Sequence, residues 1–345
     1  AHSYIKEVDL EIGGQRIDRH YGSWLDIYNE LTDHQESEHV MLNKHQSRDA
    51  YLKGCVLTNT GGELNSSSHF TSKGATKGHK QTLQLNVPLK FWFCRNPGLA
   101  LPLIALQYHE VKVKLSLRGV MGLVHSDKGD TIAAADPSVK LWADYVYLDT
   151  DERRRFAQVS HEYLIEQLQH QTDTASNSVK LNFNHPVKEL VWVFQDTTAN
   201  SEGTAAADVL GSGSSNLGNY AGALSGAGND YLNYSPNAPT NAEWVNGQRS
   251  LEGFSTALLQ LNGHDRFTKR KASYFRTVQP AQHGHRVPDK HIYCYSFALK
   301  PEEHQPSGTC NFSRIDNAQL VLGLNAGAGT LKVFAVNYNV LRIMS

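Results

Sequence analysis

The chain has 345 residues, a length that suits two domains of ordinary size better than a single hydrophobic core. Hydrophobic residues make up 40% of the chain and charged residues 19%, and the 33 Lys and Arg side chains nearly balance the 34 Asp and Glu side chains. These values exclude a disordered chain and the strongly basic balance of a nucleic-acid-binding protein, and no apolar run approaches the roughly 20 residues that span a bilayer.

Alternation of apolar and polar residues, the period of a β-strand, runs through most of the chain. It predicts an aromatic strand at 89–98 and further strands at 7–12, 111–118, 139–148, 179–184, 187–195, 291–299, 318–324 and 331–341. Gly, Pro and Asn separate these segments, as is typical of an all-β sandwich or barrel whose sheets have one buried and one solvated face. The best helix candidate is 18–31, where Trp24, Ile27, Tyr28 and Leu31 recur at helical spacing.

Two stretches that are distant in the sequence read alike. LEIGGQRIDRHY begins at Leu10 and LLQLNGHDRF begins at Leu258, and each reaches a Gly-containing turn before a polar stretch with Asp and Arg. Further pairs follow in the same order in both parts of the chain: 89–98 with 292–301, and 139–148 with 331–341. Such repetition indicates an internal duplication with two copies.

We therefore predict two similar domains, residues 1–158 and residues 159–345, with Trp142 and Phe334 in related positions near the closing strands. The second copy begins with strand-like residues 179–195 ahead of its Gly turn, and the first copy lacks an equivalent. We expect the opening strands of the first domain to be missing from this chain. Its barrel should then be open, with part of its apolar strand face uncovered.

Two stretches have the composition of surface loops. Residues 196–250 are rich in Gly, Ala, Ser and Asn, and residues 59–80 are a shorter stretch of the same kind. We predict that the first forms the outermost part of the second domain and that the second decorates the first domain. Their Asn-X-Ser sequons, at Asn65 and Asn233, are the candidate glycosylation sites, whereas the sequon at Asn311 lies near a strand and suits a glycan less well.

Motifs for catalysis and cofactor binding are missing from the sequence, which has neither a phosphate-binding GxxxxGK[ST] loop nor a GxSxG nucleophile elbow. Among the 17 histidines, His283 and His285 have the spacing of a metal-binding strand, but Asp289 is the only acid nearby. We therefore predict no catalytic residue, no cofactor and no metal. The four cysteines form no C-x-x-C pair, which indicates free thiols in a reducing compartment: Cys55, Cys94, Cys294 and Cys310.

Several long strings identify a family. They include DLEIGGQRIDRHY, NPGLALPLIALQYHEVKVKL, RRRFAQVSHEYLIEQLQ, LNGHDRFTKRKASYF and NYNVLRIMS. In these strings the chain resembles the major capsid proteins of large icosahedral double-stranded DNA viruses, most closely the chlorella-virus type. The resemblance spans nearly the whole chain and fails mainly in the two loop stretches. It implies an all-β double jelly roll of two tandem eight-stranded antiparallel barrels, the first of them incomplete at its amino-terminal end here.

The resemblance also implies a homotrimer, in which three chains with two lobes each form a pseudo-hexagonal capsomer that tiles an icosahedral shell. The implied partners are neighbouring capsomers, minor capsid (cement) proteins and glycans. The implied place is the outer capsid of a virion assembled in the host cytoplasm, near an internal membrane that the chain does not span, without direct contact to nucleic acid. Three alternatives stay open: a carbohydrate-binding jelly roll with an exposed aromatic platform, a jelly-roll metal enzyme that uses His283 and His285, and a minor capsid or vertex protein of the same virus class.

Overall fold

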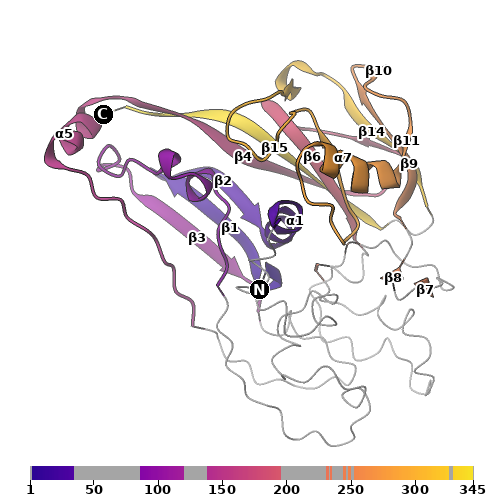
Figure 1. The fold of residues 1–345 in the computed structure, drawn as a ribbon, viewed down its shortest axis with the longest axis horizontal. Helices are drawn as coiled ribbons and strands as arrows, with labels where there is room; N and C mark the ends of the chain where they lie inside the picture. The colour runs from indigo at the N-terminus through magenta and orange to yellow at the C-terminus, as the bar shows by residue number, and fades with distance from the viewer. Residues whose placement is uncertain are drawn as a thin grey trace, which may run out of the picture.

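The computed structural model describes residues 2–34, 86–119, 138–195, 231–232, 234, 244–245, 248–249, 252–325 and 329–344. Asn65, Asn233, residues 59–80 and nearly all of residues 196–250 lie outside this part of the chain, so the expectations about loops and glycosylation stay predictions. Figure 1 shows the described residues as antiparallel sheets with few helices. Below, the amino-terminal half means the described residues up to 119, and the carboxy-terminal half means those from 161 onward.

The sheet of the amino-terminal half has the strand order β2-β1-β3. Gly13 and Gly14 join its first two strands in a two-residue turn, with φ of 60° and 80°, a conformation that glycine adopts without strain. Val8 and Leu10 lie on the buried face and pack with Leu25. The elements are the short helix η1 (His2–Tyr4) and the strands β1 (Ile5–Ile12), β2 (Gln15–Tyr21) and β3 (Val111–Leu117).

Two further sheets pack face to face as a sandwich in the carboxy-terminal half. Their orders are β10-β9-β14-β5, with β11 beside β9, and β12-β6-β15-β4, with β13 beside β6. Trp192, Phe254, Leu320 and Val333 belong to the apolar core between them. The strands are β4 (His161–Thr174), β5 (Ser178–Lys180), β6 (Pro186–Gln195), β9 (Phe254–Leu261), β10 (His264–Asp265), β11 (Arg270–Lys271), β12 (Ile292–Ser296), β13 (Cys310–Asn311), β14 (Ala318–Leu324) and β15 (Thr330–Ile343), and β7 (Trp244–Val245) pairs with β8 (Gln248–Arg249) apart from them.

The repeated string has the same local structure in both places. β9 meets β10 through a two-residue turn at Asn262 and Gly263, with φ of 51° and 81°, just as β1 meets β2 through its two glycines. Positive φ at both central residues marks the type I′ hairpin, whose twist matches that of the strands that it joins. The duplication in the sequence therefore encodes the same hairpin twice.

Strand β6 of the β12-β6-β15-β4 sheet is buried on both faces. Its outer face is covered by α1 (Gly22–Thr32), whose Trp24, Ile27 and Leu31 pack with Val191 and Phe334. Every residue of β6 after Pro186 is buried, the charged ones included. The expectation of one solvated face is therefore wrong for β6, because a helix of the amino-terminal half takes the place of solvent there.

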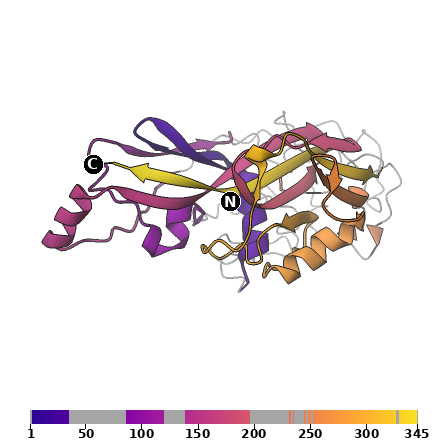
Figure 2. The ribbon, with the colours of Figure 1, turned by 90° about the horizontal axis from the view of Figure 1, so that it is seen from above.

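β4 and β15 are long strands that contact both halves of the chain. Each has 14 residues, and Figure 2 shows the pair running out of the sandwich toward the C-terminus. Tyr163, Ile165 and Leu341 pack into the core beneath the β2-β1-β3 sheet. In addition, Gln167 Nε2 donates a hydrogen bond to the carbonyl oxygen of Ile17 at 2.5 Å. This two-stranded ribbon ties the two halves together.

Two predicted elements take a different form in the structure. Residues 139–148 alternate like a strand but form none, and no described strand pairs with them. Trp142 is 86% exposed there, whereas Phe334 is fully buried, so these two residues do not share an environment. The predicted helix at 18–31 begins only at Gly22, because the residues before it pair with β1 as strand β2.

Residues 89–98 also depart from the predicted aromatic strand. They form two short helices, and Asn96 Oδ1 caps the second by accepting a hydrogen bond from Gly98 N at 2.9 Å, with Pro97 in the first position. The basic run at 153–155 is exposed and lies on a helix. The two short helices are α4 (Trp92–Arg95) and η5 (Pro97–Leu99), and the helix with the basic run is α5 (Thr150–Gln158). The helical elements that follow are η7 (Tyr274–Val278), α7 (Gln279–Gln282) and η8 (Phe312–Arg314).

Two predictions about other features can be compared with the described residues. No helix among them is long and apolar enough to cross a membrane. Cys94, Cys294 and Cys310 are free thiols, as predicted, and Cys55 lies outside the described residues.

Candidate functional site at the junction of the two halves

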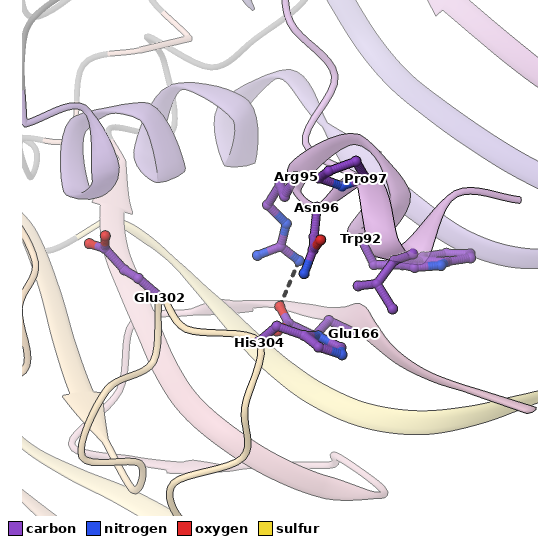
Figure 3. Close-up of a pocket in the computed structure, with 8 residues that line it drawn as sticks. Trp92, Arg95, Asn96, Pro97, Glu166, Glu302 and His304 are labelled. Carbon is purple, nitrogen blue, oxygen red and sulfur yellow. Dashed lines mark hydrogen bonds and ion pairs between the residues drawn. The ribbon is translucent and has the colours of Figure 1, made fainter. Parts of the chain in front are cut away.

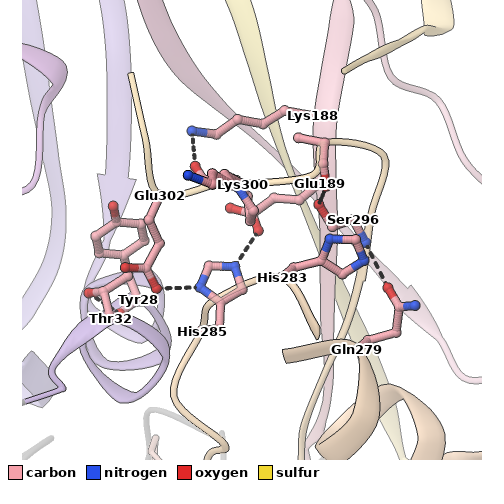
Figure 4. Close-up of polar contacts among 12 residues, drawn as sticks. Tyr28, Thr32, Lys188, Glu189, Gln279, His283, His285, Ser296, Lys300 and Glu302 are labelled. Atoms are coloured by element: carbon pink, nitrogen blue, oxygen red, sulfur yellow. Dashed lines mark hydrogen bonds and ion pairs between the residues drawn. The ribbon is translucent and has the colours of Figure 1, made fainter. Parts of the chain in front are cut away.

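A group of polar side chains lies between α1 and the outer face of the β12-β6-β15-β4 sheet, where the two halves meet (Figure 4). It is called the junction cluster here and consists of Tyr28, Arg95, Glu166, Lys188, Glu189, His285 and Glu302. Because both halves contribute side chains, the cluster exists only when they are packed together.

A β-bulge places two charged residues of β6 on the same side of the sheet. The register between β6 and β15 shifts so that Val336 pairs with Glu189 and Asn337 pairs with Val187. Lys188 is therefore the extra residue of the bulge. Val187 faces the core of the sandwich, while Lys188 and Glu189 both reach ionic partners of the junction cluster.

Glu166, which is buried on β4, is held by two cations. Its Oε2 lies 2.6 Å from Arg95 Nη2 and 2.8 Å from Lys188 Nζ. Arg95 also donates to the hydroxyl of Tyr28 at 2.8 Å, and Lys188 donates to the carbonyl of Pro301 at 2.6 Å. Burial raises the pKa of Tyr28 to about 12, so its hydroxyl stays neutral. Burial alone would lower the pKa of Arg95, but Tyr28 and Glu166 outweigh it and raise that pKa.

His285 lies between two carboxylates. Its Nε2 is 2.9 Å from Glu189 Oε2, its Nδ1 is 2.7 Å from Glu302 Oε1, and the side chain is only 1% exposed. Burial opposes protonation, but Glu189 and Glu302 outweigh it and raise the pKa of His285 to about 9. Burial likewise opposes ionisation of Glu189, yet His285 and Lys188 bring the pKa of that carboxyl below its usual value.

The charges of the junction cluster balance. Arg95, Lys188 and protonated His285 face the carboxylates of Glu166, Glu189 and Glu302. Such a buried network adds little net stability compared with apolar packing, but leaving one of its charges unpaired is costly. The cluster therefore favours one relative position of α1, α4 and the sheet over others.

A second polar contact holds α1 at Asp26. Its Oδ2 accepts hydrogen bonds from Lys290 Nζ at 2.6 Å and from the hydroxyl of Tyr234 at 3.0 Å, and His2 Nδ1 lies 3.6 Å from Oδ1. Asp26 is 1% exposed, so this anion is also paired away from solvent. Since Lys290 and Tyr234 come from the carboxy-terminal half, this contact also ties the halves together.

A pocket opens beside the junction cluster but is small (Figure 3). Its volume is about 180 Å³, below the roughly 300 Å³ at which small-molecule sites usually begin. It is lined by Trp92, Arg95, Asn96, Pro97, Leu99, Glu166, Glu302 and His304. Two of its charged groups, Arg95 and Glu166, are already paired with each other. In the described part of the chain no group of three or more His, Cys, Asp or Glu residues is arranged to hold a metal ion.

Comparison with known families covers both halves. Residues 1–149 match the family described as "Major capsid protein N-terminus", and residues 152–345 match the family described as "Large eukaryotic DNA virus major capsid protein". The chain belongs to the major capsid proteins of large eukaryotic DNA viruses.

Related capsid proteins match this one over its whole length. The major capsid protein of Pyramimonas orientalis virus is 44% identical over 375 residues, which cover 100% of this chain and 75% of that protein. The major capsid protein of Paramecium bursaria Chlorella virus 1 is 41% identical, with coverage of 100% and 78%. These relatives confirm the family and the chlorella-virus likeness that the sequence strings indicated.

Solved structures confirm the fold of this capsid protein. A chain of the PBCV-1 virus capsid has a TM-score of 0.67 and 36% sequence identity, covering 100% of this chain and 82% of that one. The Faustovirus major capsid protein, at 12% identity, has a TM-score of 0.61 over 99% of this chain and 72% of that one and thus shows the fold alone. The fold class is the predicted all-β double jelly roll of viral capsid proteins.

The predicted site residues of this capsid protein are not gathered in one place. Asn65 and Asn233 lie outside the described residues, and Asn311 is exposed with its side-chain oxygen accepting from Ser313 N at 3.0 Å. His283 and His285 do not share a site, because His283 Nδ1 faces the carbonyl of Leu299 at 3.3 Å while His285 is held between carboxylates.

The junction cluster of this capsid protein was missed in the sequence, although a signal for it exists. Lys188 and Glu189 stand next to each other inside the apolar string VKELVWVF, where a strand with a buried face would carry at most one of them on that face. A charged pair within such a string indicates a bulge with partners on the same side of the sheet. The residues around the partners, such as His285, contain no sequence pattern that predicts their place in the junction cluster.

Proposed function

We propose that this chain is the structural unit of an icosahedral viral shell, and that three copies associate into a pseudo-hexagonal capsomer. The observation that carries the proposal is the match to capsid families across both halves of the chain. Two lobes per chain, proposed at residues 1–158 and 159–345, give six lobes around a threefold axis. Closed symmetry of this kind makes a hexagonal tile.

The surface of the described residues supports extensive contacts with other protein. Residues 139–147 expose large apolar side chains, among them Leu141, Trp142 and Tyr147, the last of which is 92% exposed. Contiguous apolar surface of this kind is usually covered in the working form of a protein. We expect the interfaces within the capsomer to bury more than about 2,000 Å² each, as obligate assemblies do.

The proposal includes the setting of the protein in the particle. Its partners are further copies of itself and minor capsid proteins that cement neighbouring capsomers. Its place is the outer capsid, assembled in the host cytoplasm around an internal membrane that it does not span. Glycans would be carried at Asn65 and Asn233. The role is structural, which agrees with membership of a capsid family and makes an enzymatic activity unnecessary.

The size of the purified native protein tests the proposal. Light scattering coupled to size-exclusion chromatography should give three times the mass of one native chain at micromolar concentration, before any correction for glycans. Negative-stain images should show a hexagonal outline. A protein that remains monomeric under these conditions would contradict the proposed capsomer.

One observation favours carbohydrate binding as a second candidate function. Trp142, Tyr145 and Tyr147 are exposed on one extended segment, and exposed aromatic rings are what a carbohydrate-binding surface needs. A glycan array on the assembled protein distinguishes the two roles of this segment. Glycan binding that is lost in Trp142→Ala supports carbohydrate recognition. If no glycan binds, the exposed segment serves contacts with other protein.

A further inference from the structure

Three segments that are distant in the sequence meet at His285. Strand β6 contributes Glu189, and the loop after β12 contributes Glu302. The end of α1 is joined to the same place by two contacts: Arg286 N donates to the carbonyl oxygen of Leu31 at 2.7 Å, and His34 Nε2 lies 3.1 Å from the other oxygen of Glu302. Since α1 belongs to the amino-terminal half, His285 stands where the halves are joined.

With Glu189 and Glu302 ionised, the contacts favour a proton on both ring nitrogens of His285. A neutral imidazole has one N–H donor and one lone pair. Here each nitrogen faces a carboxylate oxygen, at 2.9 Å on Glu189 and at 2.7 Å on Glu302. The lone pair of a neutral ring would point at an anion, whereas an imidazolium donates to both. The contacts therefore agree in direction with the raised pKa of His285.

Other charged and titratable groups around His285 support the same state. Lys188 and Arg95 lie near Glu189 and help to keep it ionised. Tyr28 and Cys294 also lie within electrostatic range of Glu189, and burial raises the pKa of each, so both stay neutral. His34 is on the far side of Glu302 and is half exposed, with a side-chain exposure of 49%. Lys188 and Arg95 thus act on Glu189, His34 contacts Glu302, and the neighbouring Arg286 pairs with Asp289.

We propose that His285 acts as a proton-dependent clamp that holds the amino-terminal half against the carboxy-terminal sandwich, closed while the ring is protonated and released when it loses its proton at alkaline pH. The folded pKa of His285, about 9, is above the unfolded value of 6.5. The stabilisation is therefore fully present below pH 6.5 and is lost as the pH rises through 9. The clamp is a property of one chain and is independent of capsomer formation.

Direct titration of His285 is the primary test. Histidine-labelled wild-type protein, with the His285 signal assigned by its loss in His285→Gln, should show a ring that titrates near pH 9. Glu302→Gln removes one of the two anions, so the titration should move at least one pH unit toward the ordinary histidine value. Glu303→Gln is the matched control, because Glu303 is exposed beside it and pairs with Lys300 instead. A His285 ring that titrates near 6.5 in the wild-type protein overturns the proposal.

Release of the clamp is tested by hydrogen exchange. After correction for the intrinsic rise with pH, exchange at the amide of Arg286 and in α1 should increase at least tenfold between pH 7 and pH 10 in the wild-type protein. The increase should be absent in His285→Gln, where these amides exchange fast at both pH values, and unchanged in His304→Gln. If α1 is equally protected at both pH values in the wild-type protein, no clamp exists. If His285→Gln fails to fold, the hydrogen exchange of the wild-type protein and the titration shift in Glu302→Gln still test the clamp.

Discussion

At the scale of single residues, Gly22 shows how closely α1 approaches the first strand. A Cβ atom at this position would lie 2.1 Å from the carbonyl oxygen of Ile5 and 2.3 Å from that of His2. Both obstacles are backbone atoms, so no rotamer change can relieve the clash. Gly22→Ala should therefore lower the free energy of unfolding by about 3 kcal/mol, measured by chemical denaturation.

Gly119 provides the control for that substitution. A Cβ atom there would meet no atom within 4 Å. Gly119→Ala should change the free energy of unfolding by less than about 0.5 kcal/mol. If both variants are equally stable, the start of α1 does not pack against the backbone as described.

Lys188 is the residue at which pairing in the junction cluster can be tested. It is 1% exposed and shares Glu166 with Arg95. Lys188→Met leaves Glu166 with one cation, and the free energy of unfolding should fall by roughly 3 kcal/mol or more in denaturant titrations. Adding Glu166→Gln should recover part of the loss, because the buried charge is then removed.

An exposed ion pair gives the comparison for Lys188. Lys300 and Glu303 pair at 2.8 Å, but their side chains are 66% and 56% exposed. Because solvent screens such a pair, Lys300→Met should leave the denaturation midpoint unchanged. If Lys300→Met lowered the free energy of unfolding as much as Lys188→Met does, burial would not be the reason why the ion pairs of the junction cluster matter for stability.

At the scale of elements, α1 covers the outer face of β6 and of the strand residues beside it, which would otherwise face solvent. Ile27 is fully buried against Val191 and its neighbours. Ile27→Ala opens a cavity between helix and sheet, and the expected loss is about 2–4 kcal/mol of the free energy of unfolding. Ser23→Ala, at a half-buried position of the same helix, is the control and should stay within about 0.5 kcal/mol of the wild type.

At the scale of the whole molecule, two histidines bound the pH range of stability. Burial, with a smaller effect from Lys332, lowers the pKa of His170 to about 4. A histidine whose folded pKa is lowered contributes stability above its unfolded value of 6.5, and that contribution is lost as the pH falls toward 4. His285 acts in the opposite sense at alkaline pH. Thermal stability should therefore be highest near pH 6.5 and should fall on both sides, toward pH 4 and toward pH 9.

The acid side of this profile can be assigned by substitution. The His170 ring stacks on Phe334 at 4.7 Å and lies 4.6 Å from the ring of Tyr21, so Phe can replace it with similar packing. In His170→Phe the fall in melting temperature between pH 6.5 and pH 4 should be smaller than in the wild type. The same change at the exposed His264 should leave the fall intact; if it does not, the acid transition belongs to other groups.

The sequence by itself determined the features that depend on local pattern. Alternation predicted β1, β3, β6, β12, β14 and β15 with small errors at their ends. The repeated Gly-containing turns predicted the same hairpin at Gly13 and at Gly263, because only a few residues adopt positive φ without strain. The shared strings also identified the capsid family. Each of these depends on residues that are close together in the chain.

Only the tertiary structure decided which of the alternating segments pair with another strand. Residues 139–148 alternate as well as β15 does, yet no described strand pairs with them. The capsid protein buries both faces of β6 because a helix from the other half covers it, which no periodicity within β6 can reveal. The ionic partners of Lys188 and His285 likewise cannot be predicted from the sequence, because Glu166 and Glu302 lie on distant segments. These pairs are also buried only after folding, which removes the solvent that would screen them. Alternation specifies a face, whereas burial and charge pairing are decided by what the rest of the chain brings to that face.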